Sequence, residues 1–181
     1  CQEILATDFS IEMIKTAEQN LLKSNKKNVT FKQMDNLKMD TEDSYFDIVT
    51  ARHTCIDANQ IYRTLKKNGI LILRGVDKLD CWSLKLLFQK GQSYDDVKPI
   101  SQIDYENILK AGFKHVELIP IYIREYYKTK EDLLALLLKT PILIDFDKKE
   151  MNDKLDVNKP IDLDLLDQYI LYNTTDKGIL L

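Results

Sequence analysis

The sequence predicts an α/β fold built on a doubly wound, mostly parallel sheet with helices on both faces. Through the first two thirds of the chain, short apolar runs alternate with segments in which apolar residues recur at helical spacing. The run Ile70–Leu73 is continuously apolar, which is typical of a strand covered on both faces. Because strands separated by helices of this length are joined by right-handed parallel crossovers, the alternation favours a parallel sheet.

The first expected unit is a strand, a turn and a helix. Ile4–Ala6 is a short apolar run that is followed closely by an acid, Asp8. Ser10 can cap the next helix, and Glu12 places an acid in its first turn. Ligands of open α/β sheets bind beyond the carboxyl ends of the strands, where an acid can accept both hydroxyls of a ribose. Asp8 is therefore a candidate ribose ligand, and the alternative is that it only helps to cap the helix.

The other elements follow from the same periodicities and from turn residues. A basic last turn and the glycine of Lys67–Gly69 end a helix that carries Ile61 and Leu65 on one face. The further expected helices are Cys81–Phe88, Ser101–Lys110, Lys130–Lys139 and Ile161–Tyr172. The further expected strands are Val29–Met34, Phe46–Arg52, His115–Tyr127 and a last strand after Gly178.

We expect residues 1–181 to form a single domain with a helical insert at 129–173, between the last two strands. Insertions of this kind lie over binding sites while the sheet stays fixed, so the insert is a candidate lid. Its leucine stripe is better explained as core, or as the contact of a homodimer, than as a ligand pocket. Residues 145–159 are charged and poor in apolar side chains, which indicates an exposed linker.

The composition excludes several classes of protein. With 44% hydrophobic and 30% charged residues the chain is globular. Its net charge of −3 argues against a nucleic-acid-binding surface, so we expect no nucleic acid partner. Three cysteines without a CxxC pair indicate a reducing compartment, and two histidines exclude a His-rich metal cluster. No apolar run approaches the ~20 residues of a membrane span, and we expect a cytoplasmic protein without a metal.

Three successive strands are expected to end in polar groups. These are Asp8, Asp35 and the segment Ala51–Thr54, and in a parallel sheet they line one edge. A nucleoside ligand needs an acid for its ribose hydroxyls, an acceptor for the adenine amino group and apolar surfaces for the ring. The acid for the ribose would be Asp8, and the acceptor for the adenine amino group would be Asp35. The apolar surfaces for the ring would be Phe9 and Leu37.

The ordered set of segments resembles the class I S-adenosylmethionine-dependent methyltransferases over about residues 3 to 120. The order of the segments carries the resemblance more than any single motif does. The matching segments are ATDFSIEMI, FKQMDNL, YFDIVTARHT, IYRTLKKNGILIL and ILKAGFKHVEL.

The resemblance implies a Rossmann-like fold with an antiparallel C-terminal strand, and S-adenosyl-L-methionine as the cofactor. Asp8 would bind the ribose, Asp35 would accept the adenine amino group, and Ala51 and Arg52 would lie near the sulfonium. The residues implied to bind the cofactor are Asp8, Phe9, Met13, Asp35, Asn36, Leu37, Ala51 and Arg52.

The chain departs from the family in lacking its first strand and the Gly-rich loop that cradles the methionine end of the cofactor. In the family, that strand lies between the strand ending at Asp8 and the strand of Phe46–Val49. We therefore expect an incomplete first β-α unit in a chain truncated at both ends, or else direct pairing of the two neighbouring strands. We also expect this chain alone to bind the cofactor poorly.

The reaction implied is in-line transfer of a methyl group to an acceptor. After the fourth strand the chain reads ARHT, without the Asn/Asp-Pro-Pro-aromatic turn or the Pro-Cys pair of DNA-modifying members. Together with the acidic balance, this favours a small-molecule acceptor. His53 is the best-placed candidate base, because its reference pKa is about 6.5, although a structural histidine is the more common outcome.

The candidate acceptor-binding residues are Asp77, Trp82, Tyr122 and Arg124. Each has a plainer interpretation, as part of a solvated loop, an amphipathic helix or a β-favouring run. Two other functions stay open. A non-catalytic adenosine-binding module would keep the sheet without the cofactor loop. A nicotinamide-dependent oxidoreductase would share the ribose acid, but no Tyr-x-x-x-Lys pair follows.

Overall fold

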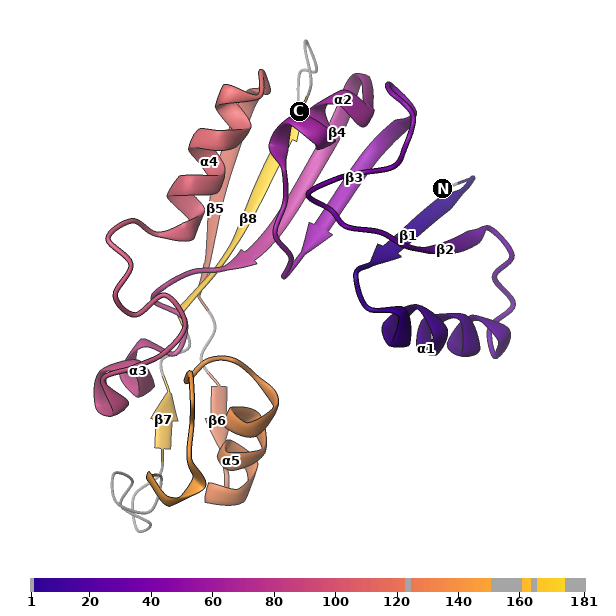
Figure 1. The fold of residues 1–181 in the computed structure, drawn as a ribbon. Coiled ribbons are helices and arrows are strands. Elements are labelled where there is room, and N and C mark those ends of the chain that lie inside the picture. Colours follow the sequence, from indigo (N-terminus) through magenta and orange to yellow (C-terminus); the bar gives the residue numbers. More distant parts are fainter. Residues whose placement is uncertain (1, 123–124, 151–160, 164–165, 175–181) are drawn as a thin grey trace.

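The computed structural model describes residues 2–122, 125–150, 161–163 and 166–174. Within these ranges the strands form three sheets (Figure 1). The first pairs β1 (Ile4–Asp8) with β2 (Val29–Gln33). The second has the order β3 (Phe46–Arg52), β4 (Leu65–Val76), β8 (Leu166–Thr174), β5 (Lys114–Tyr122). The third pairs β6 (Glu125–Tyr127) with β7 (Ile161–Leu163). The helices are α1 (Ile11–Leu22), α2 (Ala58–Thr64), α3 (Trp82–Phe88), α4 (Ile100–Lys110) and α5 (Lys130–Lys139).

The pairing directions confirm the predicted α/β class. β1 and β2 are parallel, and so are β3 and β4. β8 runs antiparallel to both β4 and β5. The antiparallel strand that the resemblance implied was expected after Gly178, which lies outside the described residues. Parallel neighbours end at the same edge of a sheet, so the residues after β1 and β2 lie together, and so do those after β3 and β4.

The unit β1-α1-β2 folds as its local sequence predicts. The Ser10 side chain accepts a hydrogen bond from the Met13 amide, which caps α1, and Glu12 lies in the first turn. Ile14 is the buried residue of α1, and it anchors the helix. The two strands pair in register from Ile4 opposite Val29 to Asp8 opposite Gln33.

β1 and β3 do not pair with each other, although they are neighbours in the arrangement of Figure 1. Of the two outcomes expected for a chain without the family's first strand, direct pairing is therefore not what the structure adopts. The facing edges of both strands lack a ladder partner among the described residues. Backbone groups on such edges depend on water or side chains for hydrogen bonds, so other contacts must hold the two sheets together.

Arg63 of α2 supplies some of these contacts by holding the linker between β2 and β3. Its guanidinium donates to the backbone oxygens of Thr41 at 2.8 Å and Met39 at 3.0 Å, and it forms an ion pair with Asp43. The amide of Ser44 donates back to the Arg63 oxygen at 2.9 Å. The linker is thus fixed at the end of β3 that is remote from the carboxyl edge.

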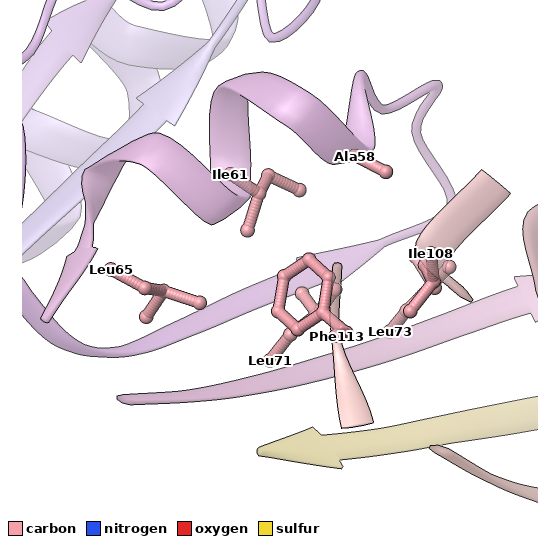
Figure 2. Close-up of a cluster of buried hydrophobic side chains, with 7 residues drawn as sticks. All are labelled: Ala58, Ile61, Leu65, Leu71, Leu73, Ile108 and Phe113. Carbon is pink, nitrogen blue, oxygen red and sulfur yellow. The ribbon is translucent and has the colours of Figure 1, made fainter. Parts of the chain in front are cut away.

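The main core lies between β4 and the helices α2 and α4. In Figure 2 the side chains of α2 and Phe113 point toward Leu71 and Leu73 of β4, and Leu71 has 0% of its surface exposed. The ring of Tyr62 packs edge-on against Phe113 at a centroid distance of 5.1 Å. The buried members of this cluster are Ala58, Ile61, Leu65, Leu71, Leu73, Ile108 and Phe113.

A second core joins α3 to α5, and it accounts for the leucine stripe of the insert. Leu133 and Leu137 of α5 are buried against Leu84 and Phe88 of α3. Gly91 packs so closely here that a Cβ atom would lie 2.6 Å from the Ile142 carbonyl oxygen, and its φ is +149°. Leu133 and Leu137 of the stripe are therefore core within one chain, which is one of the two explanations that the sequence left open.

The main correction concerns residues 161–172, which the sequence predicts to be a helix. The structure has β7 and most of β8 there. The run Tyr169–Tyr172 is rich in strand-favouring residues, and β8 finds a partner strand on both of its edges. Pairing across the whole sheet, which no local window contains, therefore overrides the helical spacing. Among the described residues of the insert at 129–173, α5 is followed by helical residues at 148–150 and then by the strands β7 and β8.

Smaller corrections concern element boundaries. The helix expected to reach Lys67–Gly69 ends at Thr64, because Leu65 already pairs with Phe46 as the first residue of β4. The single expected strand His115–Tyr127 is the two strands β5 and β6. The expected last strand after Gly178 lies outside the described residues, as does most of the expected linker at 145–159. None of the described helices has the length and apolar composition of a membrane span.

We expect Leu73→Ala to destabilise the fold by about 2–5 kcal/mol, because it removes a fully buried side chain between β4 and the helices. Urea unfolding followed by circular dichroism measures the change. Leu86→Ala is the matched control, since Leu86 is half exposed on α3, and it should change stability far less. Equal losses in the two variants would contradict the assignment of the main core.

Candidate functional site

The carboxyl ends of β1, β3 and β4 point toward the same side of the molecule, where α3 and α5 also lie (Figure 1). The register of β1 with β2 ends at Asp8 opposite Gln33, and the Met34 amide donates to the Asp8 backbone oxygen at 3.0 Å. Asp35 follows directly. The two acids predicted to hold a nucleoside therefore follow adjacent strands at one edge, which we call the rim.

Only one carboxylate oxygen of Asp8 takes part in the turn that leads into α1. Oδ1 accepts a hydrogen bond from the Ser10 amide at 2.8 Å, which fixes the turn before α1. Oδ2 accepts no hydrogen bond from another described residue. The capping role and the ligand role proposed for Asp8 are thus compatible in one half-buried side chain.

Asp35 repeats this arrangement at the end of the next strand. Its Oδ1 accepts from the Leu37 amide at 2.9 Å, and its Oδ2 has no partner among the residues that the structure describes. The side chain is exposed. Each acid is therefore oriented by the backbone two residues further on and keeps one oxygen for an outside donor.

Three large apolar side chains stand exposed beside these acids. Phe9 is 73% exposed, Met13 57% and Leu37 52%. Apolar side chains that gather on a surface mark binding sites more often than single ones do. All three were predicted to border an adenine ring, and the structure leaves them free to cover one.

The end of β3 contributes Ala51, Arg52 and His53. Ala51 packs against the main core, so it offers its backbone to the rim, whereas Arg52 and His53 are exposed. The His53 amide donates to the Arg74 oxygen at 3.0 Å. His53 is exposed as a residue, but partial desolvation of its imidazole, with Arg52 and Arg74 nearby, lowers the pKa of the ring below its ordinary value. The ring is therefore mostly neutral near pH 7.

Asn36 spans the interval between the two sheets, a role that its sequence position did not reveal. Its amide accepts from the Thr7 hydroxyl at 3.3 Å and donates to the Thr54 hydroxyl at 3.0 Å. Thr7 and Thr54 were not among the predicted site residues. The sequence held one indication of them, because Thr7 directly precedes Asp8 and Thr54 directly follows His53. Asp8 and His53 were selected because they follow the ends of parallel strands, and the same argument applies to these two threonines.

The predicted acceptor-binding residues are dispersed beyond β4 and β5. The buried Asp77 carboxylate accepts from the Lys78 amide at 2.7 Å, the Ile100 amide at 2.9 Å and the Ser101 hydroxyl, so it fixes the start of α4. Tyr122 is the last residue of β5, and Arg124 lies outside the described residues.

Trp82 belongs to a separate cluster on α3. Its ring lies 5.4 Å from that of Tyr94, and the Lys78 ammonium lies 5.8 Å from the centroid of the Trp82 ring. Lys85 of the same helix is only 2% exposed and donates to the Lys78 oxygen at 2.9 Å. Burial lowers the pKa of its amine, against the attraction of Asp80 and other acids nearby. Neither contact was predicted, because both depend on how α3 docks.

No cluster of three or more potential metal ligands occurs among the described residues. The polar groups of the rim are carboxylates, an amide, hydroxyls, the Arg52 guanidinium and the His53 imidazole. This set can accept hydrogen bonds from hydroxyl and amino groups, and it can accept a proton at His53.

Comparison with known proteins gives fold and family. The YcgJ protein of Bacillus subtilis has a TM-score of 0.62 at 17% identity, with 98% of this chain and 84% of that chain covered. Phosphoethanolamine N-methyltransferase 2 of Haemonchus contortus, in complex with S-adenosyl-L-methionine, has a TM-score of 0.55 at 19% identity, covering 97% and 44%. The tRNA (m1A58) methyltransferase TrmI of Aquifex aeolicus has a TM-score of 0.51 at 14% identity, covering 97% and 54%.

No curated protein matches the sequence. A family model described as a methyltransferase domain matches residues 2–112, which is more than half of the 181-residue chain. The matched region holds β1 to β4 and the whole rim. The fold and the family match agree, and the chain belongs to the class I S-adenosylmethionine-dependent methyltransferases.

Proposed function

We propose that this chain transfers a methyl group from S-adenosylmethionine to a small-molecule acceptor, with the adenosine end of the cofactor on the rim. One observation carries the proposal. Asp8 and Asp35 follow adjacent parallel strands, and each keeps one carboxylate oxygen without a partner among the described residues. A nucleoside offers hydroxyl and amino donors to two such acceptors.

The rim fits the nucleoside half of the cofactor. Asp8 would accept hydrogen bonds from the ribose hydroxyls, and Asp35 would accept one from the adenine amino group. The adenine ring would pack against the exposed side chains of Phe9, Met13 and Leu37, and this contact would remove apolar surface of both from water.

The other half of the site would lie at the end of β3. When bound, the cofactor would supply a methyl group on a positively charged sulfur. The acceptor atom would bond to the methyl carbon from the side opposite to the sulfur, which leaves as a neutral thioether. The backbone at Ala51 and the side chains of Arg52 and His53 would border this region and orient the acceptor. Holding two reactants in place can contribute about 7–11 kcal/mol to such a reaction. His53 is neutral near pH 7, so it can take up a proton from the acceptor.

The acceptor class is supported by charge and by the insert. A net charge of −3 suits a small acceptor better than a nucleic acid. The helices α3 and α5 lie on the rim side and would cover a small acceptor, with Trp82, Tyr122 and Arg124 as the proposed contacts (Figure 1). The buried Asp77 carboxylate is engaged with the start of α4 and is not proposed as a contact. One similar structure is named for phosphoethanolamine and another for tRNA, so the acceptor needs a direct test.

We expect Asp8→Ala and Asp35→Ala each to weaken binding of S-adenosylhomocysteine by about tenfold to a hundredfold, because each removes hydrogen bonds to a charged acceptor. Isothermal titration calorimetry measures the affinity. Glu42→Ala is the matched control, since Glu42 is an exposed acid in the linker at the end of β3 that is remote from the rim. Unchanged affinity in both rim variants, or tighter binding of NAD than of S-adenosylhomocysteine by the unaltered protein, would contradict the proposal.

With tritiated S-adenosylmethionine as donor, we expect label to enter small amines, acids or phenols and to stay soluble in acid. The physical reason is that an acidic protein is not attracted to a polyanion. Bulk tRNA and genomic DNA serve as competing acceptors in parallel reactions. Label that precipitates with either nucleic acid would show that the acceptor class is wrong.

The rate should fall on the acid side with a midpoint below the ordinary histidine value of about 6.5, because His53 must be neutral to accept a proton. Stability should fall in the same direction, since a lowered pKa means that the unfolded chain binds the proton more tightly. A pH–rate profile of the protein and of His53→Gln measures the first effect. The variant should lose this acid limb, and a profile identical to that of the unaltered protein would exclude His53 as the base.

A further inference from the structure

Asn36 joins two parts of the proposed site that no shared strand ladder joins. Asp8 and Asp35 stand on the β1–β2 sheet, whereas His53 follows β3 in the second sheet. A ligand that touches both parts requires their spacing to be fixed at the rim. Arg63 fixes the linker at the other end of β3, so it does not meet this requirement.

The hydrogen bonds around Asn36 form a chain with one direction. The Thr7 hydroxyl donates to Asn36 Oδ1 at 3.3 Å, and Asn36 Nδ2 donates to Thr54 Oγ1 at 3.0 Å. Thr54 Oγ1 in turn donates to the Cys55 carbonyl oxygen at 3.3 Å. Because the Thr54 proton points to that carbonyl, the hydroxyl presents a lone pair to Asn36. The side-chain amide of Asn36 therefore accepts a hydrogen bond through Oδ1 and donates one through Nδ2.

Each member of this chain is the direct neighbour of a proposed site residue. Thr7 precedes Asp8, Asn36 follows Asp35, and Thr54 follows His53. Asn36 is half-buried, whereas Asp35 and Leu37 on either side of it are exposed. Its position therefore suits a contact between the sheets better than a contact with the ligand.

We propose that Asn36 is a positioning residue that sets the spacing between the nucleoside part of the cofactor site and the methyl-transfer part at the end of β3. This inference rests on the proposed function. A ligand confined to the β1–β2 sheet, such as adenosine, does not depend on that spacing. A ligand that also reaches β3, such as S-adenosylhomocysteine, depends on that spacing. It makes both sets of contacts only when the two sheets are the right distance apart.

The test compares these two ligands on the same variants by calorimetry or ligand-observed NMR. Asn36→Ala and Thr54→Val should each weaken S-adenosylhomocysteine about tenfold and change adenosine less than about twofold, as expected for loss of one hydrogen bond that orders two parts. Thr54→Ser keeps the hydroxyl and should restore the affinity. The double variant should be no worse than either single one, because both remove the same contact.

Asn59→Ala on α2 and Thr30→Val near the start of β2 are the matched controls, since both side chains are exposed and neither lies at the carboxyl end of a strand. Both variants should bind the two ligands as the unaltered protein does. Equal losses for adenosine and S-adenosylhomocysteine would mean that Asn36 binds the nucleoside itself, which overturns the inference. So would unchanged binding of both ligands. If Asn36→Ala unfolds, the contrast between Thr54→Val and Thr54→Ser decides. Because weak binding is expected of this chain, the titrations use high ligand concentrations. Failure of the unaltered protein to bind either ligand at those concentrations would instead refute the proposed function, and the inference with it.

Discussion

The unpaired edges of β1 and β3 are the constraint on which the rest of this structure depends. Parallel strands normally share a continuous ladder, and the ladder fixes how far apart their carboxyl ends lie. Here the ladder is interrupted between β1 and β3, which belong to different sheets. Side chains replace it, with the Arg63 guanidinium holding the linker at one end and the Asn36 amide crossing the rim at the other.

This arrangement divides the site into two parts that are each rigid for their own reasons. Asp8 and Asp35 are oriented by backbone amides two residues further along, inside a unit that is capped and paired in register. His53 is held through its amide by the neighbouring strand β4, which is packed into the main core. The chemistry of either part is local, and what couples them is a small number of polar contacts.

Sequence reasoning succeeded where structure is decided locally. The unit β1-α1-β2 follows from a run of apolar residues, a capping serine and helical spacing, and α5 has its predicted limits of Lys130 and Lys139. It failed for β8, because a strand with partners on both edges is selected by the sheet and not by its own periodicity. The bridge from Asn36 to Thr54 and the burial of Lys85 escaped it for the same reason. Both depend on how distant segments dock, which spacing along the chain does not record.

The hydrogen bonds of Asp77 have a consequence for how proteins of this kind diverge. One buried carboxylate ties the end of β4 to the first residues of α4, so the chain between them leaves and rejoins the fold at a single clasp. Because α3 inside this loop packs against α5, a change of its buried residues acts on the second core. The exposed residues of the loop carry no such constraint, and they can therefore vary while the clasp keeps β4 and α4 in place.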